Sequence, residues 1–133
     1  MQSVGETMTS PPQIIDGLAT VREAMDHMRK ENYSALVIDR RHKGDEYGLV
    51  AVHDIADKVI ARNLSPDRTN VYEIMSKPVL TVDVDMDVKY AIRLLSRFRL
   101  SRALVTREGE MVGMVTLRDM VFRSVLPAAN TED

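Results

Sequence analysis

Apolar and polar residues follow a pattern that changes from strand to helix and back along the chain, and the whole pattern occurs twice. From Val21 onward, apolar residues stand at the helical spacing i, i+3, i+4 and i+7, and Thr20 and Glu23 have the spacing of a capping box. Short apolar runs predict the strands. In the first copy the predicted elements are a strand at 13–15, a helix at 20–32, strands at 35–39 and 47–52, and a helix that opens at Asp54.

The second copy follows the first at a constant offset. Met8-Thr9-Ser10-Pro11 corresponds to Met75-Ser76-Lys77-Pro78, an offset of 67 residues from Met8 to Met75. The offset falls to 65 between Gly48 and Gly113, so the loop between the last two strands is two residues longer in the first copy. In the second copy the predicted elements are a strand at 79–82, a helix at 87–99 capped by Asp87, strands at 102–106 and 111–116, and a helix that opens at Asp119.

The repeat predicts the fold class and the domain organisation. A unit of about 60 residues buries too little surface to be stable alone, so the two copies are expected to form one module with pseudo-twofold symmetry. The predicted fold is α+β, with two β-α-β-β-α repeats. The predicted boundaries are 1–62 for the first repeat, 63–70 for a linker, 71–127 for the second repeat and 128–133 for a flexible tail.

Composition and spacing exclude several classes of function. The chain of 133 residues has no cysteine and a net charge of −2, which leaves no disulfide, no thiolate site and no field that attracts nucleic acid. No apolar stretch approaches the ~18 residues that span a bilayer. The histidines lack metal-ligand spacing, and no nucleophile stands in a pattern with a base. We expect a cytoplasmic protein that is not an enzyme, requires no cofactor and contacts neither membrane nor nucleic acid.

Three motifs give the chain a resemblance to a known family. Met-Thr/Ser-x-Pro precedes the first strand of each copy, Ser-Ala-Leu-Val-Ile-Asp covers residues 34–39, and Gly-Leu-Val-Ala-Val-His-Asp and Gly-Met-Val-Thr-Leu-Arg-Asp end at Asp54 and Asp119. In these motifs, over about residues 4–126, the chain resembles a tandem pair of CBS domains. The resemblance implies a regulatory module, not itself catalytic, that binds adenosine nucleotides in clefts between the repeats.

The resemblance also implies the residues of a first ligand site. Asp119 would hold the ribose hydroxyls and Thr116 would contact the phosphate or ribose region, as a carboxylate and a hydroxyl can. From the residues alone, the alternative is that Asp119 simply caps a helix. The remaining predicted ligand-binding residues are Ile14, Ile15, Ser34, Ala35, Met114 and Arg118.

A second, weaker site is predicted with the roles of the halves exchanged. Ala51 stands where the second copy has Thr116, so one hydrogen bond worth about 1 kcal/mol is missing. The arginines 97, 99, 102 and 107 lie near this site and either bind phosphate or form a solvated face. The predicted residues of the second site are Leu49, Asp54, Thr81, Val82 and Ser101.

Two functions follow from these features. The first is a sensor of AMP, ADP or ATP that regulates an unidentified protein, with AMP favoured because the local positive charge is small. The alternative is a dimerisation or protein-interaction scaffold whose clefts are vestigial. In both cases we expect a homodimer through the helices at 20–32 and 87–99, because Leu94 and Leu95 point in two directions from one helix.

Overall fold

The computed structural model describes residues 2–9 and 13–124, so the predicted tail at 128–133 lies outside the described residues. The chain packs as two compact units. Of the described residues, the first-repeat unit contains 13–79, and the second-repeat unit contains 80–124 together with 2–9. The boundaries of the compact units therefore differ from those of the sequence repeats. The segment before the first repeat packs with the second repeat, and the segment before the second repeat packs with the first.

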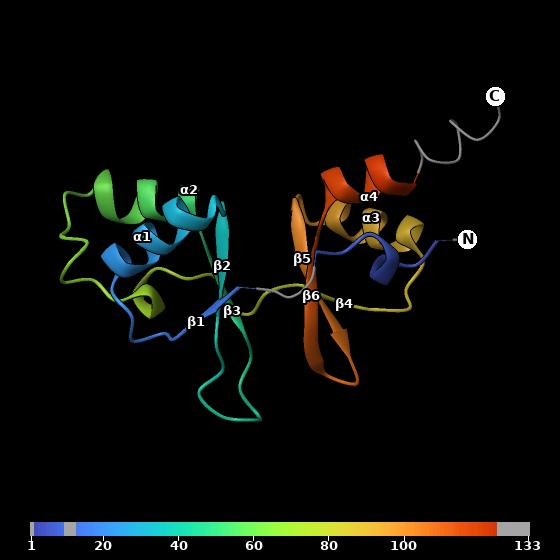
Figure 1. Ribbon diagram of the computed structural model, residues 1–133, viewed down its shortest axis with the longest axis horizontal. Coiled ribbons are helices and arrows are strands. Elements are labelled where there is room, and N and C mark those ends of the chain that lie inside the picture. The colour runs from blue at the N-terminus through green and yellow to red at the C-terminus, as the bar shows by residue number, and fades with distance from the viewer. Residues whose placement is uncertain (1, 10–12, 125–133) are drawn as a thin grey trace. The chain divides into compact units, whose positions relative to one another are not determined.

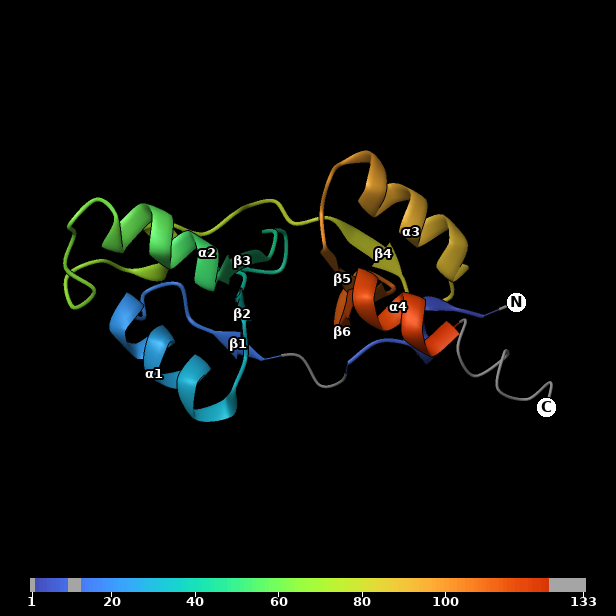
Figure 2. The same ribbon diagram turned by 90° about the horizontal axis from the view of Figure 1, so that it is seen from above.

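The first-repeat unit is a three-stranded sheet with helices on one face (Figure 1). Strand β1 is parallel to β2, and β2 is antiparallel to β3. Figure 2 shows α1 and α2 on the same side of this sheet. The elements are β1 (Ile14–Ile15), α1 (Val21–Glu31), β2 (Ala35–Ile38), β3 (Gly48–Ala51), α2 (Val52–Ile55), a π-helical continuation (Ala56–Ile60) and the 3-10 turn η3 (Val71–Glu73).

The second-repeat unit has the same topology. Strand β4 is parallel to β5, β5 is antiparallel to β6, and α3 and α4 cover one face (Figure 1). The elements are the 3-10 turn η1 (Val4–Glu6), β4 (Thr81–Asp83), α3 (Val88–Arg97), β5 (Arg102–Arg107), β6 (Glu110–Thr116) and α4 (Leu117–Ser124). The predicted α+β class and the predicted order of elements are confirmed in both units.

The predicted helix caps are confirmed, and two helix starts are corrected. The N–H of Glu23 donates to Thr20 Oγ1 at 3.1 Å, and the N–H of Thr20 donates to Glu23 Oε1 at 3.0 Å. The N–H of Lys89 donates to Asp87 Oδ1 at 3.1 Å. The helices predicted to open at Asp54 and Asp119 begin two residues earlier, at Val52 and Leu117, so both aspartates lie in a first helical turn.

The segment before each repeat makes the same hydrogen bonds to the other repeat. The N–H of Val4 donates to Met86 O at 2.8 Å and the N–H of Gly5 donates to Val84 O at 2.9 Å. At an offset of 67 residues, the N–H groups of Val71 and Tyr72 donate to Ala19 O and Gly17 O at 2.9 and 3.1 Å. We call residues 2–9 and 69–77 the lead-in segments. Each one completes the unit built from the sheet of the opposite repeat.

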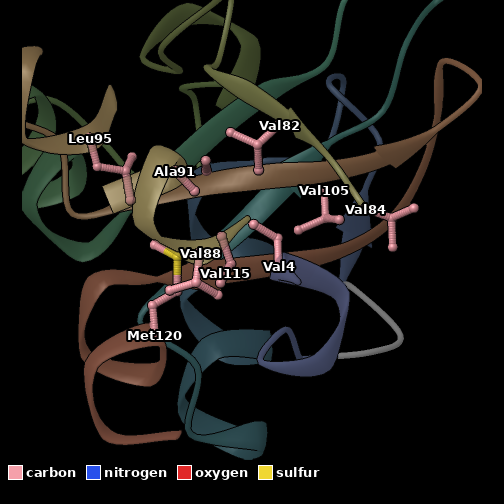
Figure 3. Close-up of a cluster of buried hydrophobic side chains, with 10 residues drawn as sticks. Val4, Val82, Val84, Val88, Ala91, Leu95, Val105, Val115 and Met120 are labelled. Atoms are coloured by element: carbon pink, nitrogen blue, oxygen red, sulfur yellow. The ribbon is translucent and has the colours of Figure 1, made fainter. Parts of the chain in front are cut away.

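The lead-in segments also close the hydrophobic cores. Figure 3 shows Val4 among side chains from the strands and helices of the second-repeat unit, including Val82, Val115 and Met120. Val4 is fully buried there. In the first-repeat unit Val71 is fully buried in the same way, with Leu36, Ile38, Val50 and Val59 in its cluster. The 3-10 turns are therefore part of the cores and not surface connections.

We expect Val4→Ala to lower the free energy of unfolding by about 1.5–3 kcal/mol, because it removes fully buried methyl groups and leaves a cavity. Glu6→Ala is the matched control, since Glu6 lies in the same turn and is exposed, and it should change the free energy by less than about 0.5 kcal/mol. Urea denaturation measures both. A Val4→Ala protein as stable as the control would show that η1 does not pack in the core.

Candidate functional site

In each unit the start of the middle strand, the end of the last strand and the start of the last helix meet at one edge of the sheet. We call this the helix-start edge. Its residues in the second-repeat unit are Ser101, Arg102, Thr116 and Asp119, and its residues in the first-repeat unit are Ser34, Ala35, Ala51 and Asp54. The structure thus brings together, within each unit, several of the residues that the sequence nominated.

The second-repeat edge is organised by short backbone contacts. The N–H of Leu117 donates to Ser101 O at 2.9 Å, which ties the start of α4 to the start of β5. Arg102 lies directly across from Thr116 in the β5–β6 register. The N–H of Asp119 donates to Thr116 Oγ1 at 3.0 Å, so the hydroxyl of Thr116 caps the helix.

The carboxylate of Asp119 therefore does not act as the cap. The side chain is half-buried, and within residues 2–9 and 13–124 nothing donates a hydrogen bond to its oxygens. The backbone of Asp119 is held in place by Thr116, while both carboxylate oxygens can accept hydrogen bonds from another molecule. The cap interpretation thus applies to Thr116, and Asp119 has acceptor capacity that the fold does not use.

The first-repeat edge uses its carboxylate differently. The N–H of Val52 donates to Ser34 O at 3.0 Å, the counterpart of the contact between Leu117 and Ser101. Asp54 is buried and accepts the N–H of Ala51 on Oδ2 at 2.9 Å, and Lys58 Nζ lies 3.5 Å from its Oδ1. Both oxygens of Asp54 are thus engaged within the unit.

The two edges differ in the chemistry that they present. The second-repeat edge carries a guanidinium, a hydroxyl and a carboxylate, on Arg102, Thr116 and Asp119. A carboxylate is a good acceptor for a vicinal diol, and a guanidinium is a good partner for a phosphate. At the equivalent positions the first-repeat edge has two alanines, Ala35 and Ala51, which face each other in the β2–β3 register.

The remaining nominated residues divide between the two sheets. Ile14 and Leu49 both pair with Val37, and Thr81 and Met114 both pair with Leu104. Each unit therefore holds members of both predicted sites. The combination of residues from the two units into shared sites stays a prediction.

Burial and packing define the environment of three of the predicted site residues. Val82 is buried in the core of its unit, so only its backbone can face a ligand. Ile15 is half-buried and packs against the core of the first-repeat unit. Arg118 is exposed, and its guanidinium lies 5.0 Å from the centre of the Phe122 ring.

Sequence reasoning missed two features of the helix-start edges. Lys58 stands four residues after Asp54, the helical spacing of an ion pair, so the sequence contained this signal. Arg102 was assigned to the weaker site, whereas the structure places it beside Thr116. The strand register, which puts Arg102 opposite Thr116, could not be read from the sequence alone.

Within residues 2–9 and 13–124, no group of three or more histidine, aspartate or glutamate side chains is placed to hold a metal ion. Over the same residues, no helix has the length and apolar character needed to cross a membrane.

Comparison with known families identifies the class of the chain. CBS domains match residues 4–61 and 71–125, which are the two repeats. The chain therefore belongs to the CBS domain family, and it contains a pair of these domains.

Particular relatives agree with this assignment. The hexameric CBS-CP12 protein of bloom-forming cyanobacteria superposes with a TM-score of 0.88 at 34% identity, covering 96% of this chain and 74% of that one. The CBS domain pair of protein MJ0100, solved with methylthioadenosine and S-adenosylmethionine, gives a TM-score of 0.79 at 26% identity over 98% of both chains.

Curated relatives are longer than this chain. An uncharacterised protein of Methanopyrus kandleri, MK0525, is 30% identical over 124 residues, which are 91% of this chain and 63% of that protein. The shares covered of two further relatives, from Thermofilum pendens and Methanocaldococcus jannaschii, are 43% and 60%. The chain thus spans about two fifths to two thirds of the length of these relatives.

The geometry predicts opposite roles for the two aspartates in stability. Asp54→Ala should lower the free energy of unfolding by about 1–3 kcal/mol, because the N–H of Ala51 loses its acceptor and Lys58, which keeps its hydrogen bond to Ile74 O, loses its ion pair. Asp119→Ala should change it by less than about 0.5 kcal/mol. Thermal and urea unfolding of the two variants measure the difference. Equal losses would contradict the distinction between an engaged and an unengaged carboxylate.

Proposed function

We propose that this chain is a regulatory module that binds an adenosine-containing ligand, with Asp119 accepting hydrogen bonds from the ribose hydroxyls. The observation that carries the proposal is the half-buried carboxylate of Asp119, which no described residue engages although Thr116 fixes its backbone. A carboxylate placed in this way is a ready acceptor for two adjacent hydroxyls.

Neighbouring groups support the same ligand class. Two arginines supply positive charge near Thr116. Arg102 lies across from Thr116 in the sheet, and Arg118 follows it by two residues. Two arginines suit a single phosphate better than a triphosphate, so AMP is the favoured ligand, ahead of ADP and ATP. Ile14, Ile15, Ser34, Ala35 and Met114 are proposed to complete the site around the base.

A solved relative adds to this support. The CBS pair of protein MJ0100 was solved with methylthioadenosine and S-adenosylmethionine, both of which contain adenosine. Neither carries a phosphate, so the feature common to them and to AMP is the nucleoside. The proposal therefore rests on recognition of the ribose and base, and the group attached to the ribose is the variable part.

The weaker site is proposed at the first-repeat edge. There the Asp54 carboxylate must give up its contacts with the Ala51 N–H and Lys58 before it can hold ribose hydroxyls. No hydroxyl corresponds to that of Thr116, because Ala51 occupies its place. Leu49, Thr81, Val82 and Ser101 remain the other proposed residues of this site.

A panel of AMP, ADP, ATP, S-adenosylmethionine and methylthioadenosine tests the proposal. At a concentration of 100 times Kd, a ligand should stabilise the fold by about 2.7 kcal/mol and raise Tm by roughly 5–10 °C. Asp119→Asn should weaken binding by roughly tenfold to a hundredfold, since a charged acceptor is lost, and Asp54→Asn should weaken the tighter site by less than about threefold. Calorimetric titration measures both affinities.

Two outcomes would contradict this account. The first is the absence of any thermal shift with the whole panel at millimolar concentration, which would favour the alternative function of an interaction scaffold. The second is an equal loss of affinity in Asp119→Asn and Asp54→Asn, which would remove the distinction between the edges.

We further propose that the chain forms a homodimer through the helices of the second-repeat unit. Phe98 at the end of α3 and Phe122 on α4 are 56% and 47% exposed, and Val121 beside Phe122 is 43% exposed. Contiguous exposed apolar patches mark interfaces in soluble proteins, and the proposal is that these side chains form such a patch. Leu94, which the sequence suggested as part of the dimer face, packs against the core of its own unit, so a charge there would test folding and not assembly.

Light scattering of the unmodified chain at micromolar concentration should give about twice the mass of 15.0 kDa. Phe122→Glu should shift the protein to the monomer mass, because a charge in an apolar interface loses its hydration. Leu64→Glu is the control, since Leu64 is 49% exposed but lies in the first-repeat unit. A monomer mass for the unmodified chain would refute the dimer.

A further inference from the structure

The first-repeat unit has a pocket of about 610 Å³ at the edge opposite its helix-start edge. The pocket lies where β1 and β2 end, and η3 of the lead-in segment forms another wall. Its volume falls in the range of about 300–1,000 Å³ that is typical of small-molecule sites. All of its lining residues belong to residues 13–79, and none of them was nominated for either adenosine site.

Two residues at this pocket are exchanged relative to the second repeat. In the first-repeat unit Gly17 faces Tyr72, and a Cβ placed on Gly17 would lie 3.5 Å from the Cβ of Tyr72. In the second-repeat unit the equivalent pair is Val84 and Gly5, where Val84 is buried and its Cγ2 fills the space beside Gly5. The larger side chain of the pair is thus the buried Val84 in the second repeat and Tyr72 in the first. Tyr72 is 50% exposed and forms a wall of the pocket.

Apolar side chains form the body of the pocket. Ile38 is buried at the end of β2, and Met75 packs partly against the same core. Leu18 also lines the pocket and is 73% exposed. Together with the Tyr72 ring, these side chains offer a surface for an apolar group of a ligand.

Charged groups of both signs surround this apolar surface. The carboxylate of Asp39 accepts the N–H of Arg40 on Oδ1 at 2.8 Å, which fixes its position at the end of β2. Arg41 and Lys77 also line the pocket. The residues equivalent to Asp39 and Arg41 in the second repeat are Thr106 and Glu108, so these charges are specific to the first repeat.

The carboxylate of Asp45, in the longer loop, contacts both cations. Lys77 Nζ lies 2.8 Å from Asp45 Oδ1, and the backbone N–H and Nε of Arg41 lie 3.0 and 3.3 Å from Asp45 Oδ2. The ammonium of Lys77 and the N–H of Arg41 hold the pKa of the Asp45 carboxyl well below its usual range. Asp45 therefore stays ionised and keeps both cations at the pocket at neutral pH.

We propose that this pocket binds a small zwitterionic ligand with an apolar body, such as an amino acid with an aromatic or branched side chain. The ammonium of the ligand would meet Asp39, its carboxylate would meet Arg41 and Lys77, and its side chain would lie on Ile38 and Met75. The site is independent of the adenosine sites, because it lies at the other end of β2.

Three probes with the same ring separate the contributions of the charges. L-Phenylalanine carries both charges, phenylacetate only the carboxylate and phenethylamine only the ammonium. In ¹⁵N-resolved NMR titrations, phenylalanine should give saturable shifts at the amides of Gly17, Leu18 and Arg40. Phenylacetate and phenethylamine should each bind at least about tenfold more weakly, because one charged contact is lost.

Three variants locate the binding. Gly17→Val copies the residue of the second repeat and should abolish the phenylalanine shifts, and its backbone accepts a side chain because a Cβ meets neighbours only at 3.4 and 3.5 Å. Arg41→Gln should weaken phenylalanine and phenylacetate but not phenethylamine. Asp39→Asn should weaken phenylalanine and phenethylamine but not phenylacetate. Arg29→Gln on the exposed face of α1 is the control and should leave all three affinities unchanged.

Arg41 has an 80% exposed side chain, so its variant remains informative even if Gly17→Val unfolds. Shifts that do not saturate, or equal affinity for all three probes, would overturn the proposal. Phenylalanine shifts confined to Thr116–Asp119 would also overturn it and would assign the amino acid to the helix-start edge. This test is independent of the adenosine sites: in Asp119→Asn, AMP binding should be weakened while the phenylalanine shifts remain.

Discussion

The structure depends on the exchange of lead-in segments between the two repeats. Val4 closes the core of the second-repeat unit and Val71 closes that of the first, each through the same pair of backbone hydrogen bonds. A unit of this size has little apolar surface to bury, so one fully buried valine is a substantial part of its core. Each repeat therefore depends on a segment from outside its own sequence boundaries, which explains why the two occur as a pair in one chain.

The exchange also positions both candidate sites. The lead-in segments pair with the last strands, through Thr9 with Met114 and Ser76 with Leu49. The second lead-in segment supplies Tyr72, Met75 and Lys77 to the pocket of the first-repeat unit. The two repeats share this backbone arrangement but differ in the side chains that they present. The second repeat has polar groups at its helix-start edge, whereas the first has alanines there and a charged pocket at the opposite edge.

Much of the fold could be predicted from sequence because its signals are local. The capping box of Thr20 and Glu23 and the cap at Asp87 are set by residues three or fewer positions apart. Contacts between distant segments could not be predicted in this way. The burial of Val4 against β4 and the position of Arg102 across from Thr116 depend on packing and strand register, which a single sequence does not specify. The pocket could be predicted in part. Alignment of the two repeats shows that Gly17 and Tyr72 in the first correspond to Val84 and Gly5 in the second, but the sequence does not show the cavity itself.

Hydrogen exchange of backbone amides tests the exchange of lead-in segments most directly, because it reports the free energy needed to expose each N–H. The amides of Val4, Gly5 and Thr9 donate to Met86, Val84 and Met114, so they should exchange as slowly as the amides of β5. The amides of Val71 and Tyr72 should match those of β2. Exchange of these lead-in amides at the rate of an unstructured peptide, with β2 and β5 protected, would contradict the account.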